Sequence, residues 1–229
     1  MEPLIATLRW IHIAAGMLAL GLAPAAMLTV KGGRAHRRWG KTYFWAMAVV
    51  ASTAVVLGLF RPQIFLVLLA VFSFYQAFSG YRALSRKRPA QGQGPGVIDW
   101  AAALVTLAAS VALVVLGLLR PGPSWQGVGM VPVIFGVLGM VLAGLDVRKF
   151  ARPPTDPHAW WFAHMAGMLG SYIATVSAFS VVNFTFLPPA VRWLWPTALG
   201  VPLITLWITS YKRRFRRAAP PRIEAAPVI

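Results

Sequence analysis

The chain has 229 residues, of which 58% are hydrophobic and 12% are charged, whereas charged residues make up about a quarter of a typical soluble domain. Twenty-two lysines and arginines against five acidic residues give a formal net charge of +17. This composition excludes a soluble globular domain, and the absence of cysteine excludes disulfides, thiolate metal sites and cysteine nucleophiles. The basic residues cluster between apolar runs, as in membrane proteins, so we expect lipid and no nucleic acid as a partner.

Seven apolar runs are long enough, or nearly so, to cross a bilayer as helices, which takes about 20 residues. In chain order they are residues 10–30, 41–60, 63–81, 97–119, 127–145, 161–183 and 193–211. Backbone amides in lipid must be satisfied within the segment, and no run shows the alternation of a membrane β-strand. The sequence therefore predicts an all-α bundle of seven transmembrane helices over residues 1–217. It also predicts a disordered cytoplasmic tail over residues 218–229.

The first run is too long for the apolar core of a secretory signal, and its basic cluster follows it, so we expect a retained first helix. Eighteen basic residues follow the first, third, fifth and seventh runs. The opposite side has only four, namely Arg9, Arg61, Arg120 and Arg192. The positive-inside rule then predicts an inner (plasma) membrane protein with the N-terminus outside and the C-terminus in the cytoplasm. Its basic loops would meet anionic lipid headgroups.

Residues 10–43 combine a histidine and a glycine in the first run with a His-Arg-x-x-Gly-x-x-Tyr stretch before and within the second. This pattern resembles a family of bacterial multi-pass membrane proteins defined by a domain of unknown function. The resemblance implies a multi-helix membrane fold and supplies no activity. The positions that it marks for testing are His12, Gly16, His36, Arg37, Gly40 and Tyr43. A simpler alternative is a basic loop that binds headgroups, with a glycine that eases the turn.

The sixth run carries a stripe of polar and small residues. At about 100° per residue, His164, Ser171 and Thr175 lie on one side of a helix. The stripe fits either a tight helix–helix seam or the lining of an internal cavity by Ser171, Tyr172 and Thr175, with His164 at its mouth. Because an imidazole in hydrocarbon would leave its nitrogens unsatisfied, we expect His164 to face the bundle and to reach a partner on another helix.

The histidines suggest two kinds of site. His36, His158 and His164 share the inner boundary with Asp146, and imidazole with carboxylate suits a divalent metal such as zinc or iron. The other candidate is haem b, held by histidines among His12, His36 and His164. With a rise of about 1.5 Å per residue, His12 and His164 should stand roughly 20 Å apart and should not share one iron. The spacings match no ligand motif, and the acids can instead pair with arginines.

Three functions therefore stay open, and the sequence does not decide whether the chain is an enzyme. The first is a membrane redox protein that binds haem or a metal through histidines near the cytoplasmic face. The second is a transporter or channel for a small solute or protons, because Pro196 and Pro202 can break the last helix and expose carbonyls. The third is a non-catalytic subunit or scaffold in a homo- or hetero-oligomer, since small-residue seams serve association equally well.

Overall fold

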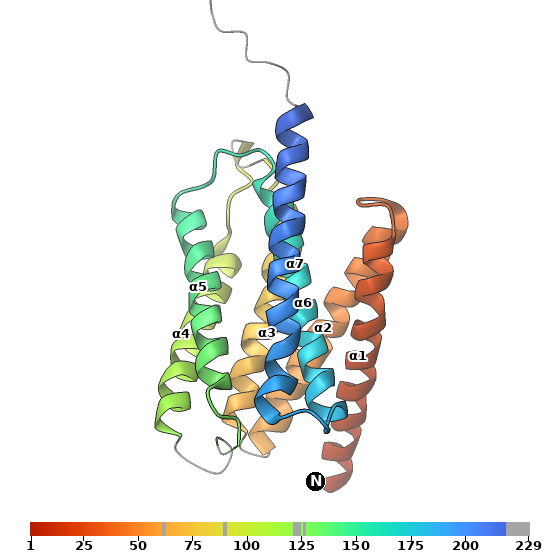
Figure 1. The fold of residues 1–229 in the computed structure, drawn as a ribbon, viewed down its shortest axis with the longest axis vertical. Coiled ribbons are helices and arrows are strands. Elements are labelled where there is room, and N and C mark those ends of the chain that lie inside the picture. The colour runs from red at the N-terminus through yellow and green to blue at the C-terminus, as the bar shows by residue number, and fades with distance from the viewer. Residues whose placement is uncertain (61–62, 89–90, 121–124, 126, 219–229) are drawn as a thin grey trace, which may run out of the picture.

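The structure is a computed structural model that describes residues 1–60, 63–88, 91–120, 125 and 127–218. Within these ranges the chain is all-helical and has no strand, and a short 3₁₀ helix, η1 (Ala83–Ser85), extends the third helix. The long helices, in chain order (Figure 1), are α1 (Glu2–Leu28), α2 (Arg34–Phe60), α3 (Ile64–Arg82), α4 (Val97–Leu119), α5 (Val131–Ala151), α6 (Ala159–Asn183) and α7 (Pro189–Ala218).

All seven long helices in the described part of the chain are long and apolar enough to cross a membrane. The prediction of an all-α, multi-pass membrane protein with seven candidate spanning helices is therefore confirmed. The predicted tail begins at Ala218, which is the last residue of α7, and its remaining positions, 219–229, lie outside the described residues.

Several helices extend beyond the apolar runs that predicted them. Helix α1 begins at Glu2, where Pro3 suits the first turn because that turn needs no amide donor. Helix α2 begins at Arg34 and so includes the basic stretch that the sequence assigned to a loop. Helix α7 continues through Pro196 and Pro202. The transporter hypothesis drew on the polar stripe of the sixth run and on a break in the last helix, and α7 is continuous at both prolines.

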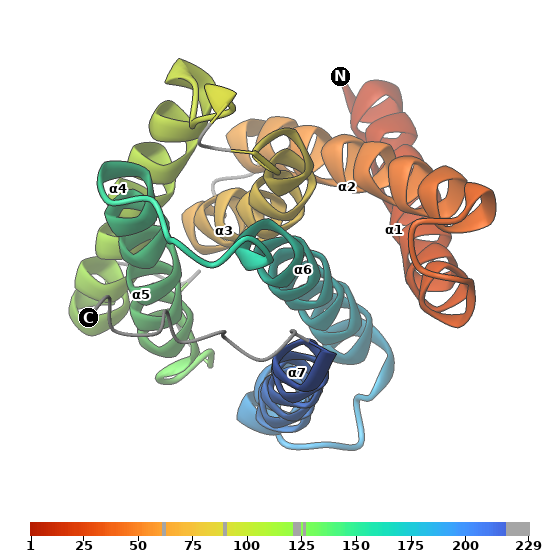
Figure 2. The same cartoon turned by 90° about the horizontal axis from the view of Figure 1, so that it is seen from above.

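Helix α6 lies near the middle of the bundle, as the view in Figure 2 shows. It packs mainly against α3 and α7, and α1 packs mainly against α2 and α4 against α5. Two glycines lie against each other in the α3–α6 seam, since a Cβ atom on Gly167 would stand 2.7 Å from the Cα atom of Gly80. Two glycines therefore let the backbones of α3 and α6 touch, as in other membrane helix pairs.

The two ends of the bundle are held differently. One end, called the basic end here, carries the α1–α2, α3–α4 and α5–α6 connections and the end of α7 (Figure 1). There, buried Asp99 of α4 accepts hydrogen bonds from Arg82 at 2.8 and 3.0 Å and pairs with Arg86 at 2.9 Å. At the opposite end, Phe65, Trp125 and Trp193 pack into a buried aromatic cluster.

Candidate histidine pocket

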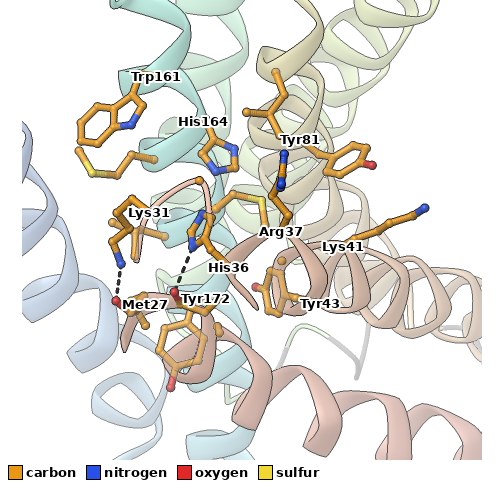
Figure 3. Close-up of a pocket in the computed structure, with 18 of the residues that line it drawn as sticks. Met27, Lys31, His36, Arg37, Lys41, Tyr43, Tyr81, Trp161, His164 and Tyr172 are labelled. Atoms are coloured by element: carbon orange, nitrogen blue, oxygen red, sulfur yellow. Dashed lines mark hydrogen bonds between the residues drawn. The ribbon is translucent and has the colours of Figure 1, made fainter. Parts of the chain in front are cut away.

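A cavity of about 610 Å³, called the histidine pocket here, opens at the basic end (Figure 3). Its wall comes from α1, α2, α6 and α7, with smaller contributions from α3 and the segment after it. Most of the lining is apolar or aromatic, and methionines from α1 and α6 are part of it. A cavity of this size and character is typical of sites that bind cofactors or other organic ligands.

Two imidazoles meet in this pocket. His36 lies in the first turn of α2, and His164 lies in the second turn of α6. Their ring centres are 6.3 Å apart, and the ring planes make an angle of 76°. Figure 3 shows the two side chains approaching each other from different helices. The fold therefore brings together two histidines that lie far apart in the sequence.

Each of these histidines is oriented by a backbone carbonyl. His164 Nδ1 donates to the carbonyl of Gly80 at 2.9 Å, and His36 Nδ1 donates to the carbonyl of Ala26 at 3.0 Å. Ala26 lies in the last turn of α1, and Gly80 lies in the last turn of α3. A carbonyl can only accept, so Nδ1 carries the proton and Nε2 keeps its lone pair. The prediction that His164 reaches a partner on another helix is confirmed.

This hydrogen-bond pattern has a chemical meaning. Histidines that bind metals usually donate the proton of the second ring nitrogen to a carbonyl or carboxylate, which fixes the tautomer and the ring orientation. His36 and His164 both meet this condition. In both rings, the Nε2 atom therefore has a lone pair with which the side chain can bind a ligand in the pocket.

Tyr43 forms part of the pocket wall and is held from behind by α6. The Tyr43 hydroxyl lies 2.7 Å from Ser171 Oγ and 3.4 Å from Thr175 Oγ1. Because Ser171 donates its own proton to the Met168 carbonyl, the Tyr43 hydroxyl is the donor to Ser171. Of the three predicted cavity-lining residues, Tyr172 lines the pocket, whereas Ser171 and Thr175 lie behind Tyr43 in the helix seam.

The pocket is positively charged. The basic side chains in its lining are Lys31, Arg37, Lys41 and Lys87, and the described part of the lining includes no acidic residue. The ammonium of Lys31 donates to the Met27 carbonyl and lies 5.6 Å from the centre of the Trp207 ring. Burial lowers the pKa of Lys31. Lys87 stands over Trp160 at 4.9 Å. Such a concentration of positive charge favours an anionic ligand.

The four residues predicted to form a metal site do not assemble. Asp146 of α5 accepts hydrogen bonds from Tyr75 and Lys149, each at 2.9 Å. His158 stacks on Phe215, with its ring nitrogen 3.5 Å from Asp156. Among the described residues, no three histidine or acidic side chains converge. The predicted metal set of His36, His158, His164 and Asp146 therefore does not come together, and of these four only His36 and His164 line the pocket, because a shared depth does not place side chains on the same side of a bundle.

His12 belongs to another part of the molecule. Its Nδ1 atom lies 2.9 Å from Thr53 Oγ1 and 3.1 Å from the Val50 carbonyl, so it joins α1 to α2. It does not line the histidine pocket. This placement agrees with the expectation that His12 and His164 would not hold the same iron.

Sequence reasoning missed several residues that build the pocket. Trp160, Trp161 and Trp207 all line it. Trp160 and Trp161 stand at a helix end, where tryptophans usually form the interfacial belt, so the sequence alone does not mark them as pocket residues. Gly80 was missed as well, although its proximity in sequence to the basic stretch after α3 was a usable signal that it lies at the basic end.

Comparisons with family models, with curated proteins and with solved structures find no match to this chain. The resemblance of residues 10–43 to a bacterial membrane protein family therefore stays a prediction.

Proposed function

We propose that this chain is a membrane redox protein that binds haem b, with His36 and His164 as the two axial ligands. The observation that carries the proposal is the separation of 6.3 Å between the two ring centres. A metal–imidazole bond of about 2 Å on each side would leave the ring centres roughly 6 Å apart. Both Nδ1 atoms donate to carbonyls, which leaves both Nε2 atoms available to the metal.

Haem fits this pocket better than a bare ion. A protein-bound zinc or similar ion usually takes three or four protein ligands, whereas this pocket offers two imidazoles and no acidic residue among its described lining. A porphyrin brings four nitrogen ligands of its own, so two histidines complete the coordination. When bound, haem supplies one-electron chemistry that no protein side chain here provides.

The pocket lining also suits both parts of haem, the apolar porphyrin ring and the two carboxylates. The apolar ring system would contact Trp161, Met168 and Tyr172, which are part of the pocket wall. The two carboxylates would pair with the pocket cations, and Arg37 is the best suited of these because its guanidinium can bind a carboxylate with two parallel hydrogen bonds. The charge of the pocket and the charge of the ligand are therefore complementary.

The same proposal places the pocket at the cytoplasmic face of an inner membrane. The basic clusters lie at the same end as the pocket, and the positive-inside rule assigns that end to the cytoplasm. The N-terminus would then lie outside, and the basic loops would contact anionic headgroups. A C-terminal fluorescent fusion that lights up in the cytoplasm would support this orientation, and a periplasmic reporter active there would contradict it.

The experiment is to purify the protein from haem-replete membranes and to record its absorption spectrum. We expect a Soret band with about one haem per chain, quantified as the pyridine haemochrome. The variants His36→Ala and His164→Ala should each lose most of the bound haem, or convert it to a form with one histidine ligand. His158→Ala is the matched control, because His158 lies at the same end outside the pocket lining. A colourless preparation, or a spectrum unchanged in both pocket variants, would refute the proposal.

A further inference from the structure

A second cavity, of about 660 Å³, lies on the side of the bundle formed by α2, α3 and α4. We call it the α3 groove, defined by Phe74, Tyr75 and Phe78 of α3 between Val55 of α2 and Ala102 of α4. Its lining is almost entirely apolar, and the hydroxyls of Ser52 and Thr106 in it donate to carbonyls of their own helices. Most of its lining residues are only partly buried in the bundle, so the groove is accessible from the lipid.

A chain of aromatic rings joins the α3 groove to the histidine pocket. The Phe74 ring, which lines the groove, lies 5.9 Å from the Phe44 ring. Phe44 stacks on Tyr81 at 4.4 Å with an angle of 17°, and Tyr81 lines the histidine pocket. A single ring, that of Phe44, therefore separates an aromatic wall of one cavity from an aromatic wall of the other.

The α3 groove also has a hydrogen-bonded connection to the basic end. Tyr75 is 3% exposed, and its hydroxyl donates to Asp146 Oδ2 at 2.9 Å. The Asp146 side chain is itself 17% exposed and pairs with the exposed Lys149. Ionisable groups within membrane helices are costly and usually serve a function. Hydrogen bonds therefore connect Tyr75, whose side chain lines the groove, through Asp146 to the exposed Lys149.

We propose that the α3 groove binds the ring of a lipid-soluble quinol, which delivers electrons to the cofactor in the histidine pocket. The identity of the electron acceptor, haem held by His36 and His164, rests on the proposed function. A quinol bound there would give up two electrons, one to the haem that His36 and His164 would hold in each of two protein molecules in turn, and would become a quinone. Its two O–H bonds break, and both protons leave to water by way of Tyr75 and Asp146. A lipid acyl chain would fill the groove but would use neither the aromatic chain nor the tyrosine–carboxylate pair.

The test uses a short-chain naphthoquinol with the detergent-purified protein, and follows ferrous haem by absorption. Ala102→Phe fills the groove from α4, and Val55→Trp fills it from α2. Each should slow reduction by the quinol more than tenfold while reduction by dithionite and the Soret band stay unchanged. Ala108→Phe is the matched control, because Ala108 is exposed on α4 outside the groove. Equal rates in wild type and both groove variants would overturn the inference.

A second readout separates this inference from the proposed function. Equilibrium dialysis with a radiolabelled naphthoquinone measures binding whether or not haem is present. Saturable binding that is lost in Ala102→Phe and kept in His36→Ala supports the groove, even if the protein proves to lack haem. Absence of saturable binding, or binding unaffected by either groove variant, shows a groove filled by lipid only and overturns the inference whatever the haem content.

Discussion

The two ends of this bundle use similar residues to different effect. Both ends are rich in aromatic side chains. A histidine whose Nδ1 atom contacts a backbone carbonyl occurs at the basic end, where it is His164, and also outside that end, where it is His12. At the opposite end the aromatic rings pack against one another around Phe65 and Trp193. At the basic end the tryptophans line a cavity that also contains a second imidazole and several cations. A histidine whose ring is oriented by a hydrogen bond becomes a candidate cofactor ligand only where it also faces a cavity, a second imidazole and positively charged side chains.

The largest effect should come from the charged contact that holds the basic end together. Asp99 has a side chain 1% exposed and pairs with Arg82 and Arg86, so Asp99→Ala would leave two guanidinium groups without their carboxylate. Loss of one partner of a buried ion pair costs about 3–5 kcal/mol, and we expect the lower end of this range because the Arg82 side chain is 31% exposed and can reach water. We expect a large fall in thermal stability in detergent, measured by intrinsic fluorescence. Asp156→Ala changes an acid that is half exposed and should alter stability little. Equal melting temperatures for the two variants would show that the contact does not hold this end.

The next effect concerns the seam that brings His164 to its carbonyl. In Gly167→Ala, the added methyl group would meet the backbone of α3 at 2.7 Å, so α3 and α6 must separate. Overpacking of this kind costs about 1–3 kcal/mol. The movement should also lengthen the contact between His164 and Gly80 and lower haem retention. Gly144→Ala is the control, because its methyl group would meet nothing within 4 Å. If Gly167→Ala is as stable as Gly144→Ala, the close α3–α6 contact is wrong.

A smaller effect should follow from the loss of one hydroxyl. Tyr43→Phe removes the hydrogen bond to Ser171 and keeps the ring in the pocket wall. A net hydrogen bond contributes about 0.5–1.5 kcal/mol, so we expect a modest fall in stability with the Soret band retained. Tyr172→Phe is the matched control, since Tyr172 lines the pocket and the described residues give its hydroxyl no hydrogen bond. A loss of haem in Tyr43→Phe would show that the hydroxyl takes part in binding rather than in support.

The sequence predicted the fold class and the number of helices because hydropathy and length decide both in a membrane. It also predicted a partner for His164 on another helix, since an unsatisfied imidazole is costly in lipid. It did not predict which side of the bundle each residue faces. Asp146 and His36 share an end of the molecule, yet α5 turns the acid toward Tyr75. That direction depends on how the helices pack around α3 and α6, and no single helix encodes it.

The sequence patterns also did not predict where the helices begin or which residues form the pocket wall. Helix α2 begins at Arg34, so His36 stands on a helix with a fixed direction rather than in a loop. Apolar runs mark only the part of a helix that lies in hydrocarbon, and they leave its polar turns unmarked. Trp161 stands at a helix end in the sequence and Trp207 lies within an apolar run, and only the arrangement of α6 and α7 places them around a common cavity.

The measurement that tests the central claim most directly is electron paramagnetic resonance of the oxidised, purified protein. Two imidazole ligands on one ferric haem give a low-spin signal, and we expect the wild type to show it. His36→Ala and His164→Ala should each replace it with a high-spin signal or remove the haem, whereas His12→Ala should keep it, because His12 contacts Thr53 and Val50 away from the pocket. A wild type with no low-spin signal, or a signal lost in His12→Ala and kept in the pocket variants, would contradict ligation by His36 and His164.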